Sequence, residues 1–265
     1  MADLAIITLS KARAYFERLA DSLDAQSARP TAPVVERILV NNANSVELTQ
    51  SAVARGWLVV EPGYNTSFSA GNNMAAKVTG AQTLLLLNDD LLLREDFLAS
   101  MWGDDGPEAD ITGALLLHTD GTINHAGTLV EADTMTGGIY KTDHIGRGAP
   151  GDSPHASGTP LVNAATFAAA MVKRPMWDRL GGLDERYYYG WEDTDFCLRA
   201  LRAGATIRCC RAAVATHNEC GTRPRGGRYD IQNGLLFQET WAGQVAEVLR
   251  VYAARAPGPI EGGGP

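Results

Sequence analysis

An amide and two carboxylates, Asn88, Asp89 and Asp90, directly follow the run of leucines at Leu84–Leu87. Mg²⁺ and Mn²⁺ prefer carboxylate oxygens. They usually take one or two from the protein and fill their other positions with phosphate oxygens and water. The same residue types also suit an Asx turn at the end of a strand. The pattern therefore predicts a site for a hard divalent cation or a structural turn, and by itself leaves both open.

A second acidic group, Glu192, Asp193 and Asp195, lies at the start of a predicted helix. The helix dipole stabilises acids in a first turn, which offers a purely structural interpretation. Asp195 fits it, because Arg199 follows four residues later, and we expect this pair on the outer face of the helix. We expect Asp193 to face a pocket, where its carboxylate would accept a proton from an incoming hydroxyl.

The third candidate, His217, follows an apolar strand. A lone histidine at such a position is more often a structural residue than a ligand. Its place at a strand end, downstream of both acidic groups, makes it a candidate metal ligand or a contact to a diphosphate.

These residues need a scaffold, and the first half of the chain supplies one by alternating apolar runs with helical patterns. Nearly unbroken apolar runs are typical of parallel strands covered on both faces. The alternation predicts a doubly wound α/β sheet, which binds ligands at the carboxyl ends of its strands. We expect strands at Leu4–Leu9, Arg37–Val40, Trp57–Val60 and Leu84–Leu87, and helices at Ala14–Leu23, Val46–Arg55 and Phe68–Val78.

The second half has weaker patterns. The stretch Val130–Val162 shows no clear periodicity and is expected to form a functional loop or lid, or else to be locally disordered. The domain prediction is a single domain over residues 1–256 and a disordered tail over 257–265, which includes Gly262–Gly264. We expect strands at Ile111–Leu117, at Phe167–Val172 and near Ile207, short helices at Pro175–Leu180 and Glu192–Ala203, and one final helix from about Trp241 to Tyr252.

Composition excludes several classes of protein. The 265 residues carry a net charge of −8 without a basic run, which argues against binding of nucleic acid. No apolar stretch approaches the roughly 18 residues that cross a bilayer, and the N-terminus lacks the basic region of a secretory signal. We therefore expect a cytoplasmic chain without a transmembrane segment.

Four cysteines, Cys197, Cys209, Cys210 and Cys220, lie close together in the sequence. Structural zinc sites usually pair their thiols as C-x2-C, whereas the adjacent Cys209 and Cys210 would point to opposite faces of a strand. We expect reduced, buried thiols. The turn after the first strand, Thr8–Arg13, matches neither glycine-rich phosphate loop, so phosphate groups would need another anchor, which a metal at Asp89 and Asp90 would supply.

In order along the chain, these segments resemble family 2 glycosyltransferases of the GT-A fold, particularly the bacterial rhamnosyltransferase-like branch. The resemblance covers roughly Leu4 to Gly221. The matching segments are Arg37–Ser45, similar to a strand with a V-D-N-A-S turn; Asn65–Asn73, similar to N-x-G-F-x-x-G-N-N; Leu84–Asp90, similar to a D-x-D-like metal site; Asp120–Gly127, similar to D-G-x-x-x-H-A-G; and Gly181–Arg199 through His217, similar to G-G-F-D-E-R, E-D-x-D-x-x-x-R and a terminal histidine.

The resemblance implies a Rossmann-like, mostly parallel sheet with helices on both faces and an inverting, hexosyl- or rhamnosyl-type transfer from a UDP- or dTDP-linked sugar. Asp193 would be the general base, while Asp90 and His217 would hold Mn²⁺ or Mg²⁺ against the diphosphate. Residues 1–110 would bind the nucleotide sugar and residues 111–256 the acceptor. The donor would contact Thr8, Asn41, Asn65, Asn72, Asn88 and Asp89.

Three residues depart from the family pattern. Asn41 replaces the acid of the base-reading turn, Asn88 replaces the first acid of the metal triplet, and Ser67 replaces a glycine. Two alternatives follow: a non-catalytic module that binds a nucleotide sugar, and a sugar-nucleotide nucleotidyltransferase, which would be expected to carry a glycine-rich basic loop. The acceptor is left open among glycans, lipid-linked sugars, peptides and small molecules, as is peripheral association with a membrane.

Overall fold

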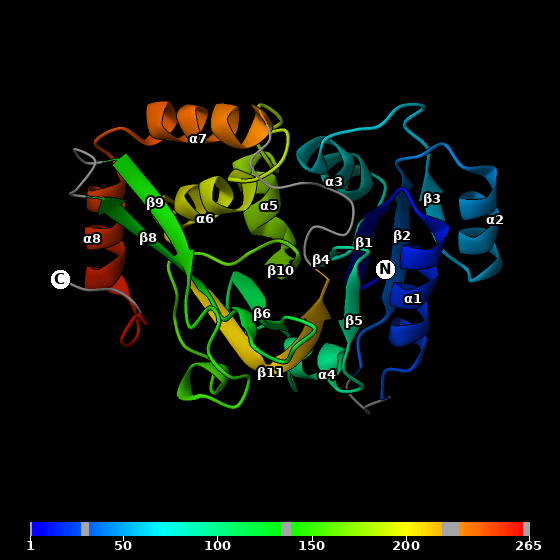
Figure 1. Cartoon of the computed structure of the whole chain (residues 1–265), viewed down its shortest axis with the longest axis horizontal. Helices are drawn as coiled ribbons and strands as arrows, with labels where there is room; N and C mark the ends of the chain where they lie inside the picture. Colours follow the sequence, from blue (N-terminus) through cyan, green and yellow to red (C-terminus); the bar gives the residue numbers. More distant parts are fainter. Residues whose placement is uncertain (1, 28–31, 134–138, 219–227, 262–265) are drawn as a thin grey trace.

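The computed structural model describes residues 2–27, 32–133, 139–218 and 228–261, so Cys220 and Gly262–Gly264 lie outside the described residues. The main sheet has the strand order β3-β2-β1-β4-β10-β6-β11-β5, with β7 paired to β6 (Figure 1). Strands β8 and β9 form a separate two-stranded sheet.

The first half of the chain has the predicted strand–helix alternation. Its strands β1–β4 pair in parallel. Serine side chains begin two of the helices: Ser45 accepts a hydrogen bond from Leu48 N at 3.2 Å, and Ser67 accepts one from Ala70 N at 3.1 Å. The elements are β1 (Leu4–Ser10), α1 (Arg13–Asp24), β2 (Val35–Asn41), α2 (Val46–Ala54), β3 (Leu58–Val60), α3 (Phe68–Lys77) and β4 (Thr83–Leu87).

The second half makes the sheet mixed. Strand β10 is antiparallel to both β4 and β6, β11 is parallel to β6, and β5 is antiparallel to β11. The parallel pairing predicted for the sheet therefore holds for β1–β4 and for β6 with β11. The elements are β5 (Leu91–Leu93), α4 (Phe97–Trp102), β6 (Ile111–Leu117), β7 (Ile123–His125), β10 (Ala169–Lys173), α5 (Arg174–Leu180), α6 (Glu192–Arg202) and β11 (Ile207–His217).

Helices cover both faces of the sheet, as predicted. Side chains alternate along β1, so that Leu4 and Ile6 pack with α1, α2 and α4, whereas Ala5 and Ile7 pack with α3, α5 and α6. On β11, Cys210 joins the first of these two cores and Cys209 the second, which confirms that the adjacent thiols point to opposite faces.

The expectation of an irregular loop over Val130–Val162 is wrong in part. Strands β8 (Thr128–Asp133) and β9 (Ile139–His144) pair as an antiparallel ladder, and a short 3₁₀ turn forms at Pro154–Ala156. The alternation that normally reveals a strand is hidden here because charged and small residues occupy this ladder. Figure 1 shows β8 and β9 beside α8 (Val245–Arg255).

The expected final helix, from about Trp241 to Tyr252, corresponds to α8 (Val245–Arg255), whereas the preceding helix α7 (Arg228–Trp241) is not expected from the sequence. The chain turns between them at Gly243, whose φ of 69° favours glycine. The tail does not leave the body at residue 257. Ile260 forms a bridge to Leu161, and Glu261 N donates to Leu161 O at 2.9 Å.

Among the described helices, none combines the length and the apolar character that a bilayer crossing requires.

Candidate active site

Three strand ends meet at one edge of the sheet. Strand β1 ends at Ser10, β4 leads into Asn88, Asp89 and Asp90, and β11 ends at His217. The register of β5 on β11 sets Leu91 opposite His217, so that the preceding Asp90 lies beside the histidine ring. Tertiary pairing thus brings together two residues that are far apart in the sequence.

Asp90 Oδ1 lies 3.3 Å from His217 Nε2. On the other side of the ring, His217 Nδ1 lies 3.2 Å from the Asn124 Oδ1 atom. Because an amide oxygen only accepts, Asn124 pairs with an N–H at Nδ1. The contact between Nε2 and Asp90 Oδ1 is then held by a proton on Nε2, as in an ion pair, or by a cation between the two atoms. Asp90 Oδ1 is buried without a hydrogen-bond partner.

This pair suits a divalent cation. Metal–ligand bonds of about 2.1 Å that meet at about 100° would separate the two donor atoms by roughly 3.2 Å. A metal-binding imidazole usually donates its other N–H to an acceptor, as His217 does to Asn124. Within the described ranges, no group of three His, Cys, Asp or Glu side chains is arranged to hold a metal ion. The remaining positions would therefore fall to diphosphate oxygens and water.

Asp89 joins the ends of β1 and β4. Its Oδ2 atom accepts a hydrogen bond from Ser10 Oγ at 2.6 Å. Burial raises the pKa of Asp89 to about 6, the neighbouring Asp90 adds to the rise, and the Ser10 bond and Lys11 oppose it. Asn88 N donates to Ala168 O at 2.8 Å, which fixes this turn against the segment before β10.

Asn41, which replaces the acid of the base-reading turn in the family that the sequence resembles, builds the turn after β2. Its amide nitrogen donates to Ser45 O at 2.8 Å and to Thr49 Oγ1 at 2.9 Å. Its oxygen accepts from Ala43 N and Ser45 N. Because Asn41 is fully buried and its amide is saturated, its structural role is to hold the turn.

The other residues predicted to contact the sugar donor differ in their exposure to solvent. Thr8 is fully buried within the sheet and offers no surface to a ligand. Asn65 is exposed at the same edge as the strand ends, whereas Asn72 is buried and donates to Phe68 O at 2.9 Å. Of these three residues, Asn65 alone presents its side chain to solvent in this structure.

Asp193 lies in the first turn of α6 and is half-buried. Its Oδ1 atom accepts from Thr194 N at 2.7 Å and from Thr194 Oγ1 at 3.3 Å. The expectation for Asp195 is half right. Its ion pair with Arg199 forms at 2.8 Å, but this pair faces inward, because Trp241 of α7 donates to Asp195 Oδ1 at 3.0 Å. The predicted outer face is wrong because α7 covers it.

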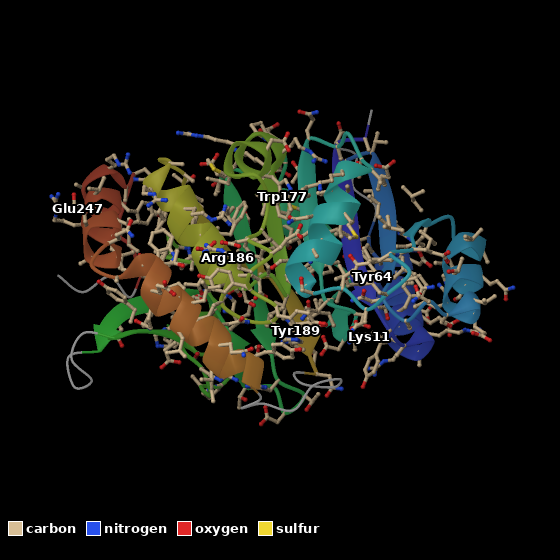
Figure 2. All side chains as sticks on the ribbon, turned by 90° about the horizontal axis from the view of Figure 1, so that it is seen from above. Lys11, Tyr64, Trp177, Arg186, Tyr189 and Glu247 are labelled. Atoms are coloured by element: carbon tan, nitrogen blue, oxygen red, sulfur yellow. The ribbon has the colours of Figure 1, made fainter. Side chains whose placement is uncertain are left out.

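The segment 181–191 connects the Asp193 helix with the strand ends. Asn73 on α3 accepts from Leu183 N and donates to Leu183 O, each at 2.9 Å, as a neighbouring strand would. Further along, Ser69 donates to Tyr187 O at 3.1 Å, and Lys11 Nζ lies 5.9 Å from the centre of the Tyr189 ring. Figure 2 shows Lys11 and Tyr189 together at this edge, between the first strands and α6.

Sequence reasoning missed two positions that support the site. Asn124 holds His217 from 93 positions away, and Asn233 on α7 hydrogen-bonds the segment that leads into α6. Asn124 lies in Asp120–Gly127, the segment similar to D-G-x-x-x-H-A-G, so the sequence pointed to this region without naming the residue. No sequence motif pointed to Asn233.

The chain is similar in sequence to two curated proteins. It is 29% identical over 218 residues to the O-antigen biosynthesis protein RfbC of Myxococcus xanthus, which covers 77% of this chain and 16% of RfbC. It is 24% identical over 191 residues to the low-salt glycan biosynthesis hexosyltransferase Agl10 of Haloferax volcanii, which covers 70% of this chain and 60% of Agl10. The chain thus spans less than two thirds of either relative. No protein-family model matches it.

Solved structures share the fold. GalNAc-T7 with UDP, GalNAc and Mn²⁺ matches with a TM-score of 0.68 and 13% identity over 96% of this chain and 50% of that one. A mannosyltransferase from Pyrobaculum calidifontis with GDP-Man and Mn²⁺ has a TM-score of 0.57 at 12% identity and covers 97% of this chain and 76% of that one. S. aureus TarS with UDP has a TM-score of 0.54 at 14% identity and covers 96% of this chain and 65% of that one.

Proposed function

We propose, from the premise that the chain is a family 2-like glycosyltransferase of the GT-A fold, that it transfers a sugar from a nucleoside diphosphate sugar to an acceptor hydroxyl with inversion. The donor is a UDP- or dTDP-linked hexose or rhamnose. The acceptor is a glycan, a lipid-linked sugar, a peptide or a small molecule. We assign the reaction to the cytoplasm, with peripheral membrane association left open, as expected from the sequence.

The observation that carries this proposal is the contact of Asp90 Oδ1 with His217 Nε2 at 3.3 Å. A carboxylate oxygen and an imidazole nitrogen that face each other across this distance suit Mn²⁺ or Mg²⁺. The pair lies at the carboxyl ends of the strands, where open α/β sheets bind their ligands. The relatives' names and the neighbours' bound UDP, GDP-Man and Mn²⁺ support a nucleotide-sugar donor.

Two groups would share the chemistry. The Asp193 carboxylate would accept the proton of the acceptor hydroxyl as its oxygen attacks the anomeric carbon from the face opposite the diphosphate. Asp90 and His217 would hold the divalent cation, which supplies charge that stabilises the departing diphosphate. Inversion by a single displacement needs no covalent nucleophile on the protein.

The protein connects these two groups through one short segment. Ala168 O accepts from Asn88 N at 2.8 Å, next to the metal pair, and Ala165 O accepts from the Cys197 thiol at 3.8 Å, one turn along α6 from Asp193. The helix that carries Asp193 and the turn that carries Asp90 therefore both contact the segment Ala165–Ala168. Fixed geometry of this kind supplies much of the rate enhancement in a displacement reaction.

A ligand-binding experiment tests the metal assignment without knowledge of the acceptor. UDP, dTDP, GDP and CDP are added with EDTA, Mg²⁺ or Mn²⁺, and the melting temperature is measured, because ligands that bind the native state raise it. We expect a metal-dependent rise with UDP or dTDP. Asp90→Asn should abolish the metal-dependent part, whereas Asp96→Asn, the same change at an exposed acid, should keep it. An unchanged rise in the Asp90 variant would refute the metal site.

A second experiment tests the base. Release of UDP or dTDP from UDP-glucose, UDP-N-acetylglucosamine and dTDP-rhamnose, with water as the acceptor, reports turnover. We expect Asp193→Asn to lower kcat by at least about 100-fold with little loss of nucleotide affinity. Unchanged turnover would remove Asp193 from this role. Nucleotide binding without any turnover by the unaltered protein would favour the non-catalytic module.

A further inference from the structure

One face of α7 contacts the segment 188–195 along its length. The α7 residues Tyr229, Asn233, Phe237 and Trp241 recur every four positions, so they lie on one side of the helix. They contact, in order, Tyr188, the backbone of 188–190, Trp191 and Asp195. The helix therefore covers the whole entry into α6, which carries Asp193.

Asn233 makes the polar contact at the centre of this face. Its side-chain nitrogen donates to Tyr189 O at 2.5 Å and to Gly190 O at 3.1 Å, and its oxygen lies 3.4 Å from Tyr188 N. The residue is buried at 3% exposure, so these carbonyl groups have little water to replace the bonds. Buried amide and carbonyl groups that lose such bonds destabilise the folded backbone around them.

The backbone held by Asn233 adopts an unfavourable conformation. Trp191 is the N-cap of α6 and has a φ of 72°, in the left-handed region that bulky residues rarely occupy. A residue in this conformation is strained and persists only where its surroundings impose it. The Phe237 ring packs on Trp191 with 4.4 Å between ring centres, and Asn233 bonds the residue just before it.

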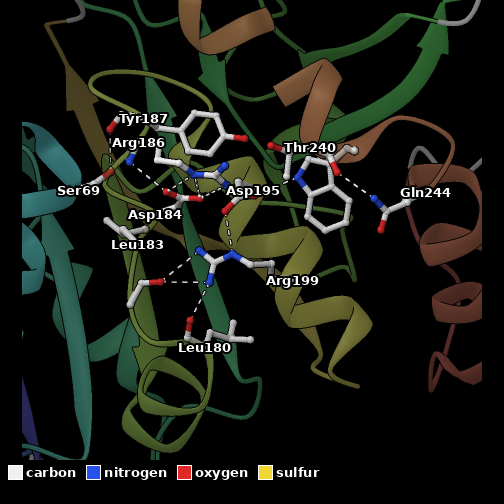
Figure 3. Close-up of polar contacts among 12 residues, drawn as sticks. Ser69, Leu180, Leu183, Asp184, Arg186, Tyr187, Asp195, Arg199, Thr240 and Gln244 are labelled. Carbon is white, nitrogen blue, oxygen red and sulfur yellow. Dashed lines mark hydrogen bonds and ion pairs between the residues drawn. The ribbon is translucent and has the colours of Figure 1, made fainter. Parts of the chain in front are cut away.

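The far end of the α6 entry is fixed as well. Asp195 accepts from the Trp241 indole at 3.0 Å and from Arg199 Nε at 2.8 Å. Figure 3 shows Asp195 between Arg199 on α6 and the end of α7 at Thr240. Asp193 thus lies between two tethers. The backbone that precedes the helix is held at Tyr187 and Tyr188 by α3 and at Tyr189 and Gly190, next to the left-handed turn, by Asn233.

We propose that Asn233 is a positioning residue that holds the 188–191 backbone in the left-handed turn and thereby aims the Asp193 carboxylate at the acceptor hydroxyl. The claim that Asn233 aims Asp193 rests on the proposed function. The claim that Asn233 holds the 188–191 backbone rests on its hydrogen bonds alone. Asn233 touches no substrate in this scheme.

Asn233→Asp is the sharpest test, because it keeps the shape of the side chain but turns its two donated bonds into contacts between oxygens. Asn233→Ser, which retains a single donor, is the milder variant in case the first fails to fold. Gln232→Ala, an exposed change on the same helix, is the matched control. Each variant is compared with the unaltered protein at a temperature well below its melting transition.

The structural readout is amide hydrogen exchange of peptides that cover 186–196, with peptides of α3 as an internal reference. We expect faster exchange at 186–196 in Asn233→Asp, an intermediate effect in Asn233→Ser and no change in Gln232→Ala. Unchanged exchange in both Asn233 variants would refute the tether, whether or not the protein is an enzyme.

The catalytic readout is the split between kcat and donor affinity, measured as nucleoside diphosphate release and as the UDP-induced shift in melting temperature. Misplacement of a base by about 1 Å lowers rate by about 100-fold, so we expect kcat to fall by about 10- to 100-fold in Asn233→Asp with nucleotide affinity unchanged. Faster exchange with unchanged kcat would overturn the positioning role. If instead Asp193→Asn keeps full activity, the proposed function fails and the exchange result still judges the tether.

Discussion

The His125 ring is fully buried where β7 meets the segment before β10. Thr166 N donates to its Nε2 atom at 3.3 Å, and the His144 ring packs edge-on with 4.8 Å between ring centres. Burial holds the pKa of His125 well below its ordinary value, and the nearby His144 and His217 add to this. The ring is therefore neutral in the folded protein.

This burial predicts a loss of stability in mild acid. Below the ordinary histidine pKa of about 6.5, the unfolded chain takes up a proton that the folded protein does not, so the free energy of unfolding falls by up to about 1.4 kcal/mol for each pH unit. We expect His125→Gln, whose amide can still accept from Thr166 N, to remove this contribution. Urea unfolding at pH 7.5 and 5.5 measures it.

The control for this prediction is His118→Gln, because the His118 ring is only half-buried. We expect that variant to keep the pH dependence of the unaltered protein. Equal slopes in the unaltered protein and in His125→Gln would contradict a neutral, buried ring.

At the scale of elements, the segment 181–191 depends on one glycine for its approach to α3. Gly182 has a φ of 77°, and a Cβ atom there would lie 2.4 Å from Asn73 Oδ1. That oxygen is the acceptor for Leu183 N. The close contact between α3 and this segment is therefore available only without a side chain at position 182.

Gly182→Ala should destabilise the protein and weaken the alignment of α6 with the strand ends. Two terms add: about 1–2 kcal/mol for the left-handed conformation, and the displacement of Asn73. Gly181→Ala is a matched control, because its φ of 73° carries the same conformational cost but a Cβ would meet nothing within 4 Å. In thermal or urea unfolding, we expect Gly182→Ala to be less stable than Gly181→Ala. Equal stabilities would contradict the close approach of α3 to position 182.

At the scale of the whole molecule, the end of the described chain closes on the long segment before β10. Glu261 Oε2 lies 2.8 Å from the guanidinium of Arg211, whose side chain is almost fully buried, and Glu261 Oε1 lies 3.2 Å from His155 Nδ1. Arg211 also donates to Ala126 O at 2.9 Å and to Ser157 O at 3.2 Å. The tail thus supplies the carboxylate partner of a buried cation.

Glu261→Gln should lower the free energy of unfolding by about 1–3 kcal/mol, because Arg211 then stays buried without its carboxylate. Truncation after Ala256 should have at least this effect, and salt should not reproduce it, since the pair is largely shielded from solvent. Deletion of residues 262–265, which removes none of the described contacts, serves as the control. Equal melting temperatures for all three forms would support the disordered tail expected from the sequence.

The sequence by itself determined the strands and helices of the first half, because β1–β4 and α1–α3 have clear apolar patterns. It also singled out Asp90 and His217 as candidate metal ligands, because each follows an apolar run, and this assignment stays a prediction. It did not predict the β8–β9 ladder, whose residues lack alternation, or α7, which precedes the final helix expected from about Trp241 to Tyr252.

Tertiary structure alone decided which of these residues act together. The register of β5 on β11 sets Asp90 beside His217, and the fold brings Asn124 to the same ring from 93 positions away. Packing of α7 turned the Asp195–Arg199 pair from an outer face into a buried one. The physical reason is common to all three: local periodicity fixes which face of an element is apolar, whereas hydrogen bonds between distant elements depend on register and on covering helices, which no local pattern encodes.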